Sequence, residues 1–209
     1  MLIEGVVGPQ SKADGAILQP RLTKTGELGM SEVHARYQEA CLRSNTFVAS
    51  SGSVTIAATH VSPLAAGTGT PVIGLFNPAG SGKNLVLLAT YTYHASGTPG
   101  GPLLWNVIPA PAGITAAGGA AMNSFTFQTS GSVSKVFANS ALTGSVVATA
   151  ARIIGGMTAV VIGSALGTFF ENIEGSSIIP QGAFAGIAAF AQGSSHIVQA
   201  AMTWEEVPA

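Results

Sequence analysis

After Thr46 the hydrophobic pattern of this chain repeats every second residue, and this period constrains the fold more than any other feature. Apolar side chains alternate with polar ones in four stretches, residues 53–61, 84–95, 124–128 and 198–205. Clusters of glycine and proline separate them, such as GTGTP, NPAGSGKN, SGTPGGP and PAPAG. A two-residue period places successive side chains on opposite faces of a strand, and glycine and proline mark turns. The sequence therefore predicts an all-β fold of short antiparallel strands, and we expect a β-sandwich.

The alternation also assigns faces within these stretches. In residues 84–95 the odd-numbered side chains are predicted to share one face: Leu85, Leu87, Ala89, Tyr91 and Tyr93. The other face is predicted to carry Thr90, Thr92 and His94. In the last stretch the apolar face is predicted to carry Val198, Ala200, Met202 and Trp204. Phe125 and Phe127 alternate with polar residues in the same way, which predicts a strand there.

The first 45 residues differ from the rest of the chain. Residues 1–30 show no sustained hydrophobic period and are rich in glycine and charge, which predicts an extended arm. Residues 31–45 predict a short helix, with Ser31 as its N-cap and Asn45 as its C-terminal stop. The helix is expected to carry an apolar stripe of Val33, Tyr37, Ala40 and Cys41. We therefore expect an arm with a short helix in residues 1–45 and the β-sandwich in residues 46–209.

Charge is nearly absent from the predicted sandwich. Between Glu39 and Glu171 the sequence contains no aspartate or glutamate, and charged residues make up only 8% of the chain. Hydrolytic, transfer and metal chemistry commonly needs a carboxylate as a base, an orienting group or a ligand. The sequence therefore predicts a protein that is not an enzyme and has no cofactor. A net charge of −1 also gives little repulsion between copies, so we expect a homo-oligomer.

The same composition argues against several partners. A balanced charge lacks the basic face that nucleic acid requires, so no nucleic-acid partner is expected. Residues 153–170 are uncharged, but glycines interrupt this run and favour buried strands over a membrane span. The start of the chain has no basic region followed by a long apolar stretch, so no signal peptide and no membrane partner are expected. Cys41 is the only cysteine, which excludes an intrachain disulfide.

Two short motifs resemble catalytic signatures but fail on spacing. GSGK at residues 80–83 lacks the first glycine and the final Ser or Thr of a phosphate-binding loop. A strand is also predicted after it, where that loop needs a helix, so we expect a hairpin turn. Ser132 and Lys135 match S-x-x-K, but the K-T-G at residues 24–26 precedes them, which is the wrong order for penicillin-recognising enzymes.

Histidine and aromatic residues offer weaker signals. His34, His60, His94 and His196 are scattered without metal-ligand spacing, so we expect no metal site and place them at strand edges or at an interface. Cys41 is expected to be a small core residue. Four aromatic residues could line a sugar-binding face, although at strand spacing core or interface positions are commoner: Tyr91, Tyr93, Trp105 and Trp204.

Three stretches resemble one protein family. They are TGELGMSEVHARYQEACLRSNTF, GLFNPAGSGKNLVLL, and IIPQGAFAGIAAF with the terminal AAMTWEEVPA. They resemble the leading segment, the NP-x-GSGK-x-L turn and the Trp-Glu-Glu-x-Pro end of small virion proteins of tailed bacteriophages. The resemblance spans about a third of the chain. It implies a jelly-roll-like head protein, of the cement or decoration kind, that assembles on a capsid.

Together these observations predict a non-enzymatic structural protein that binds and stabilises a phage capsid. The expected partners are other copies of the chain, in a trimer, and the major capsid protein, so the expected location is the capsid surface. The candidate interface comprises Arg21, Lys24, Arg36, Tyr37 and Arg43. One alternative is a tail or surface adhesin module that binds a host glycan. Another is an enzyme whose site forms between subunits, with carboxylates from Glu171, Glu174 or the arm.

Overall fold

The computed structural model describes residues 36–56, 71–96, 99–107, 120–129, 131–139, 149–153, 167–191 and 196–209. The chain divides into two units, Met1–Glu39 and Ala40–Ala209. Every strand of the described residues belongs to the second unit. The arm expected in residues 1–30 and the predicted N-cap Ser31 lie outside the described residues.

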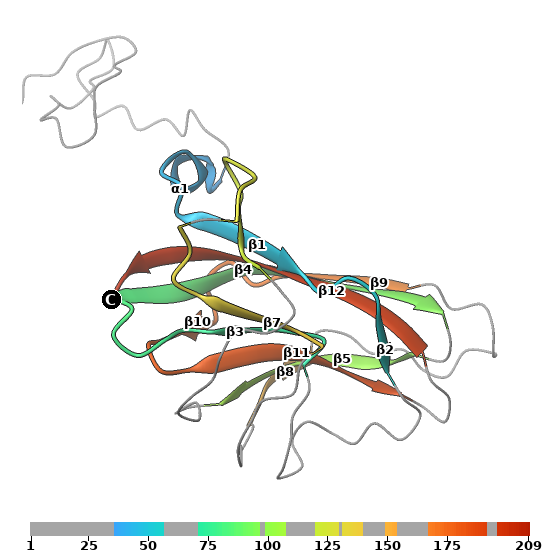
Figure 1. Ribbon diagram of the computed structural model, residues 1–209. Helices are drawn as coiled ribbons and strands as arrows, with labels where there is room; N and C mark the ends of the chain where they lie inside the picture. Colours follow the sequence, from blue (N-terminus) through green and yellow to red (C-terminus); the bar gives the residue numbers. More distant parts are fainter. Residues whose placement is uncertain are drawn as a thin grey trace, which may run out of the picture. The chain divides into compact units, whose positions relative to one another are not determined.

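The described residues form one short helix and twelve strands (Figure 1). In chain order they are α1 Gln38–Leu42, β1 Thr46–Ser50, β2 Val54–Ile56, β3 Ile73–Phe76, β4 Lys83–Ser96, β5 Pro99–Val107, β6 Met122–Asn123, β7 Lys135–Ala138, β8 Thr149–Ile153, β9 Gly167–Asn172, β10 Ile178–Ile179, β11 Phe184–Ala191 and β12 His196–Pro208. All pairings between them are antiparallel, so the predicted all-β antiparallel sandwich is confirmed.

The strands form two sheets that face each other as layers (Figure 1). The seven-stranded sheet has the order β10-β4-β12-β1-β6, with β9 also on β4 and β2 also on β12. The five-stranded sheet has the order β7-β3-β11-β5-β8. The chain crosses from one sheet to the other between β2 and β3, β3 and β4, β4 and β5, β5 and β6, β6 and β7, β8 and β9, β10 and β11, and β11 and β12. Repeated crossing, with the first strand paired to the last, is the connectivity of a jelly roll.

β12 is the central strand of the seven-stranded sheet. It pairs with β4 over nearly its whole length and with β1 on its other side. Its even-numbered side chains point into the sandwich and are buried. This was predicted for Val198, Ala200, Met202 and Trp204, and the structure adds Glu206. Trp204 stacks on Phe47 with ring centroids 5.9 Å apart. Burial of a large apolar side chain contributes about 1.5–3 kcal/mol, so this strand anchors the core.

A β-bulge in β4 reverses the faces that the period predicted. Leu87 lies opposite Trp204, but Ala89 lies opposite Thr203, so Leu88 is an extra residue on β4. An extra residue switches all later side chains to the other face. Three polar side chains therefore enter the sandwich: Thr90, Thr92 and His94. Tyr91 and Tyr93 become exposed, so the prediction that they share a face with Leu85 and Leu87 was wrong.

The NPAGSGKN segment is a turn between sheets and not the expected hairpin. β3 lies in the five-stranded sheet and β4 in the seven-stranded sheet, so the turn closes one end of the sandwich. The buried amide of Asn77 donates to the carbonyls of Lys83 (2.9 Å) and Ile179 (3.0 Å). The Asn77 side chain also accepts a hydrogen bond from Ser81 Oγ (2.7 Å). A strand follows the turn, and the turn conformation depends on Gly80 (φ 76°) and Gly82 (φ 70°).

The carboxylate of Glu206 connects β12 to the segment before β7 across the two sheets. It accepts hydrogen bonds from Ser132 Oγ (2.6 Å) and from the backbone N–H of Val133 (3.1 and 3.2 Å to its two oxygens). Trp204 Nε1 donates to the same carboxylate at 3.5 Å. Glu206 is buried, and a buried charge is tolerated only where such donors surround it.

The helix is shorter than predicted. Arg36 and Tyr37 form a turn before α1, and Tyr37 has a φ of 64°, so the predicted apolar stripe does not extend through Tyr37. The predicted C-terminal stop is confirmed in a modified form. Ser44 takes the left-handed conformation and donates to Cys41 O (2.8 Å), while Asn45 N–H donates to Ala40 O (3.0 Å). These two bonds form a Schellman motif.

Strands occupy both ends of the uncharged run at residues 153–170. Ile153 ends β8 and Gly167 begins β9, while residues 154–166 lie outside the described residues. Within the described part of the chain, no helix has the length and apolar character that crossing a membrane requires.

An aromatic ring covers two glycines on the five-stranded sheet. Phe184 lies over Gly74 and Gly186, and a Cβ at Gly74 would approach its ring to 2.3 Å. Phe137, next to Gly74 on β7, meets the same ring edge-on at 5.6 Å. Both phenylalanines are buried. Gly74 is therefore required by packing, because only a residue without Cβ leaves room for the ring there, while a Cβ at Gly186 would make a tight contact with the ring at 3.0 Å.

We expect Gly74→Ala to destabilise the fold by about 1–3 kcal/mol, because the added methyl group overpacks the Phe184 ring. Urea unfolding followed by circular dichroism measures this loss. Gly74→Ala combined with Phe184→Leu should recover part of it. Lys83→Ala, at the start of β4, should change stability by less than about 0.5 kcal/mol. Equal losses in Gly74→Ala and Lys83→Ala would contradict the packing argument.

We expect Glu206→Ala to cost about 2–3 kcal/mol, because it leaves Ser132 Oγ and the Val133 N–H without their acceptor. Glu206→Gln keeps an acceptor and should cost less. Glu205→Ala is the matched control, since its half-exposed side chain is the neighbouring carboxylate on β12. The same unfolding assay applies. A loss at Glu205 as large as the loss at Glu206 would show that the carboxylate contacts do not stabilise the sandwich.

Candidate functional site

The structure describes three of the five candidate interface residues. Arg21 and Lys24 lie outside the described residues. Arg36 is exposed, and its guanidinium carbon lies 5.5 Å from the centre of the Tyr37 ring, a cation–π contact. Arg43 is exposed directly after α1. Their role in an interface stays a prediction.

The histidine and cysteine predictions have mixed outcomes. His94 is buried and packs edge-on against Phe169 at 5.8 Å, so the expected strand-edge or interface position was wrong for this residue. His34 and His60 lie outside the described residues. Cys41 is half-buried and accepts a hydrogen bond from Thr46 Oγ1 at 2.9 Å, so it is not a core residue. No three His, Cys, Asp or Glu side chains within the described ranges gather as metal ligands would.

The carboxylates considered for an intersubunit active site lie near one end of β9. Glu171 is half-buried in β9, and Glu174 is exposed in the turn that follows, where Asn172 Nδ2 donates to it. Glu206 was not predicted as a buried group. The two-residue period of β12 contained the signal, because it places Glu206 on the same face as Trp204. Its donors give it a structural role.

The aromatic residues considered for a sugar-binding face separate into two groups. Trp204 is fully buried in the core, so the sugar-binding possibility was wrong for it. The side chain of Trp105 is not among those described. Tyr91 and Tyr93 are 43% and 38% exposed on the outer face of the seven-stranded sheet. Tyr91 packs against the exposed Phe170 of β9, with ring centroids 4.8 Å apart.

Residues 124–128 form a tight turn, here called the aromatic turn, and not the predicted strand. Asn123 organises it: its side-chain oxygen accepts hydrogen bonds from the N–H groups of Phe125 (2.9 Å) and Thr126 (3.0 Å). Its backbone N–H donates to Gln128 O (2.8 Å), and its Nδ2 donates to Ser44 O (3.0 Å). The turn is therefore attached to the segment that leads into β1.

The aromatic turn presents apolar rings to solvent. Phe125 is 51% exposed and Phe127 is 75% exposed, and Met122 and Leu42 are exposed as well. Phe127 also has a φ of 56°, a left-handed conformation that costs a bulky residue roughly 1–2 kcal/mol. An exposed side chain contributes little to the core, so burial within the subunit does not explain the strained Phe127. Such features gather at functional surfaces, and aromatic anchors dominate many protein interfaces.

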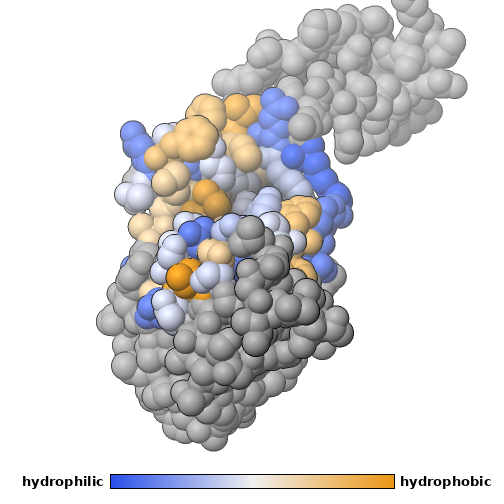
Figure 2. All heavy atoms as spheres, turned by 90° about the vertical axis from the view of Figure 1, so that its right-hand side faces the viewer, coloured by the Kyte–Doolittle hydropathy of each residue, from blue (hydrophilic) through white to orange (hydrophobic). Residues whose placement is uncertain are grey.

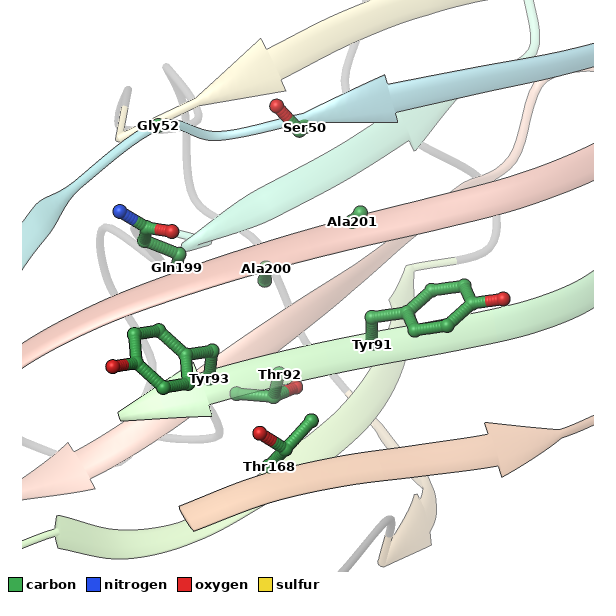
Figure 3. A pocket seen from close by; sticks show the side chains of 9 residues that line it. All are labelled: Ser50, Gly52, Tyr91, Thr92, Tyr93, Thr168, Gln199, Ala200 and Ala201. Atoms are coloured by element: carbon green, nitrogen blue, oxygen red, sulfur yellow. The ribbon is translucent and has the colours of Figure 1, made fainter. Parts of the chain in front are cut away.

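A shallow groove lies between Tyr91 and Tyr93 on one side and the segment after β1 on the other (Figure 3). We call it the tyrosine groove. It has a volume of about 180 Å³ and is lined by Ser50, Gly52, Tyr91, Thr92, Tyr93, Thr168, Gln199, Ala200 and Ala201. The two rings extend in opposite directions along β4, and the small residues of β12 lie between them and β1 (Figure 3).

The described surface carries groups suited to binding more clearly than groups suited to catalysis. In the end-on view of Figure 2, orange apolar residues lie among white and blue ones across the described surface. The aromatic turn and the tyrosine groove combine exposed rings with hydroxyl and amide groups, which can bind but do not supply an acid–base pair. Sequence reasoning missed the turn because Phe125 and Phe127 fit a two-residue period. Asn123 was the available signal, since asparagine often caps a turn through its side chain.

We expect Phe127→Asn to raise the free energy of unfolding by about 1 kcal/mol, because asparagine tolerates a positive φ and an exposed phenylalanine gains little from folding. Phe125→Asn is the control, since Phe125 does not have a positive φ. Urea unfolding at a matched protein concentration, dilute enough that both proteins are monomers, compares the two. A loss of stability in Phe127→Asn would mean that the ring supports the fold.

Comparisons with known protein families, with curated proteins and with solved structures found no match for this chain.

Proposed function

We propose that this chain is a non-enzymatic structural protein of a virion, of the cement or decoration kind, that works as a homo-oligomer on a capsid. The observation that carries the proposal is the aromatic turn, in which Phe127 is exposed and has a strained backbone. Contact with a partner protein would bury its ring. The sandwich supports it as well, since jelly rolls are a common architecture of viral capsid domains.

Two of the three stretches that resemble phage virion proteins meet at one end of the sandwich, while residues 25–35 of the leading stretch lie outside the described residues. GLFNPAGSGKNLVLL supplies β3, the turn and the first half of β4, while IIPQGAFAGIAAF supplies β10 and β11. Asn77 from the first stretch donates to Ile179 of the second, and Gly182 N–H donates to Asn77 O (2.8 Å). The terminal stretch supplies β12, which pairs with β4. The resembling residues therefore make contacts that connect the two sheets. Such contacts are expected of residues that determine the fold.

The proposed binding partner of the aromatic turn is a second copy of this chain. Copies with a net charge of −1 and few charged residues repel one another little. Burial of each exposed phenylalanine in a neighbour would contribute about 1.5–3 kcal/mol. In a trimer this gain in free energy is repeated at each contact between copies. The trimer would then stabilise the capsid by binding the assembled capsid more tightly than a loosened one.

Light scattering coupled to size-exclusion chromatography tests the oligomer. We expect the wild type to be a trimer at micromolar concentration and Phe127→Asn to shift toward monomer, although the monomer of this variant is expected to be more stable than the wild-type monomer. Ile178→Ser is the control, because Ile178 is an exposed apolar residue (56%, against 75% for Phe127) but belongs to β10, at the other end of the sheet from β6 and the turn. A monodisperse wild-type monomer would overturn the proposed contact.

Particles stripped of this protein test the capsid partner. We expect the wild type to rebind them and to raise their temperature of disruption, and we expect Phe127→Asn to rebind much less. Wild-type protein that leaves stripped particles unbound and no more stable would overturn the virion proposal.

An adhesin module is the second candidate, because the tyrosine groove has the mixed aromatic and hydroxyl lining of a ligand site. Jelly rolls also occur among lectins. The groove and the aromatic turn share no residue, so the two functions are compatible in one subunit.

A further inference from the structure

The tyrosine groove exists because the strand beside β12 is interrupted. β1 pairs with β12 as far as Ser50 and Ala201, and β2 resumes the pairing at Val54 and Val198. The intervening residues 51–53 leave the regular ladder, and Gly52 takes a φ of 65°. A Ser51 hydroxyl accepts the Ala200 N–H (3.0 Å) in place of a backbone partner. The interruption leaves Ala201, on the outer face of β12, half-exposed.

The bulge at Leu88 supplies the aromatic side of the groove. Because it reverses the later half of β4, Tyr91 and Tyr93 stand on the outer face, opposite Ala201 and Gln199. Thr168 of β9 is the neighbour of Tyr93 on the other side. The tyrosine groove therefore has three parts (Figure 3). They are the two rings on β4, the small residues of β12, and the segment after β1.

The chemistry of the lining selects one ligand class. None of the described residues that line the groove is charged, so no lining residue pairs with an ionic ligand. Ring faces attract polarised C–H groups, while Ser50, Thr168, the tyrosine hydroxyls and the Gln199 amide can exchange hydrogen bonds. The Gln199 Nε2 already donates to Ser53 Oγ (2.8 Å), which orients its oxygen as a free acceptor. A ligand with apolar ring faces and many hydroxyl groups matches these features.

We propose that the tyrosine groove binds one ring of a neutral saccharide. Its volume of about 180 Å³ is below the roughly 300 Å³ at which pockets for drug-sized ligands begin. The groove is also open, so the neighbouring units of a longer chain would stay in solvent. A surface polysaccharide, which repeats such rings many times, is therefore a better occupant than an isolated sugar, because several subunits of an oligomer can bind it together.

Saturation-transfer difference NMR with the full chain tests the site. The probes are maltotetraose, cellotetraose, mannotriose and tri-N-acetylchitotriose, with 3′-sialyllactose as the anionic comparison. We expect at least one neutral probe to receive saturation. We expect Tyr91→Ala and Tyr93→Ala to weaken its binding about tenfold, the effect of one lost ring contact. Ile178→Ala is the control on the same sheet and should bind as the wild type does.

A second variant keeps both rings. Ala201→Leu adds a branched side chain to the middle of the groove and should block the saccharide without removing either tyrosine. Light scattering on the same samples separates this proposal from the oligomer, because these variants should leave the oligomer unchanged. Saturation of no neutral probe at 10 mM, or saturation that persists in the groove variants, would overturn the proposal. A tyrosine variant that breaks the oligomer while leaving saturation intact would make the groove a contact between copies, which also overturns it.

Discussion

The pairing of β12 with its neighbours is the constraint on which the rest of the structure depends. β12 has β4 along one side and β1 along the other, and its buried side chains fill the space between the sheets. The last of them, Glu206, holds the segment before β7 through charged hydrogen bonds. A strand near the C-terminus therefore orders elements from both sheets, which is characteristic of a jelly roll, where the first and last strands are neighbours.

A single extra residue in β4 changes the character of the outer surface. Without the bulge at Leu88, Tyr91 and Tyr93 would continue the face of Leu85 and Leu87 into the core. With it, three polar side chains enter the interior and two tyrosines become available to a ligand. Bulges often redirect side chains near functional sites. Here the redirected residues are the ones that make up the aromatic side of the tyrosine groove.

The two proposed contacts use different physical devices. The aromatic turn exposes two phenylalanine rings, and the Asn123 side-chain oxygen holds its conformation by accepting two backbone hydrogen bonds. Such rings suit a protein partner that can enclose them. The tyrosine groove spreads two rings and several hydroxyl groups over a flat sheet, which suits a ligand that is itself flat and hydroxylated. A structural subunit with a saccharide-binding groove would have two roles. It would stabilise the capsid and bind the capsid to a surface polysaccharide.

The sequence by itself determined the fold class and much of the core. The two-residue period from Val198 to Trp204 and the glycine and proline clusters predicted antiparallel strands, because these patterns reflect local backbone geometry and burial. The sequence also indicated a turn at NPAGSGKN, which includes Asn77 and Gly82, but not that the turn joins two sheets. Only the tertiary structure decided the bulge at Leu88, because it depends on which residues of β12 lie opposite, and pairing between residues far apart leaves no local pattern in the chain. The sequence held a signal for the aromatic turn in Asn123 and for the inward position of Glu206 in the period of β12. The hydrogen bonds that connect Asn123 to Ser44 and Glu206 to Ser132 form only in the folded chain.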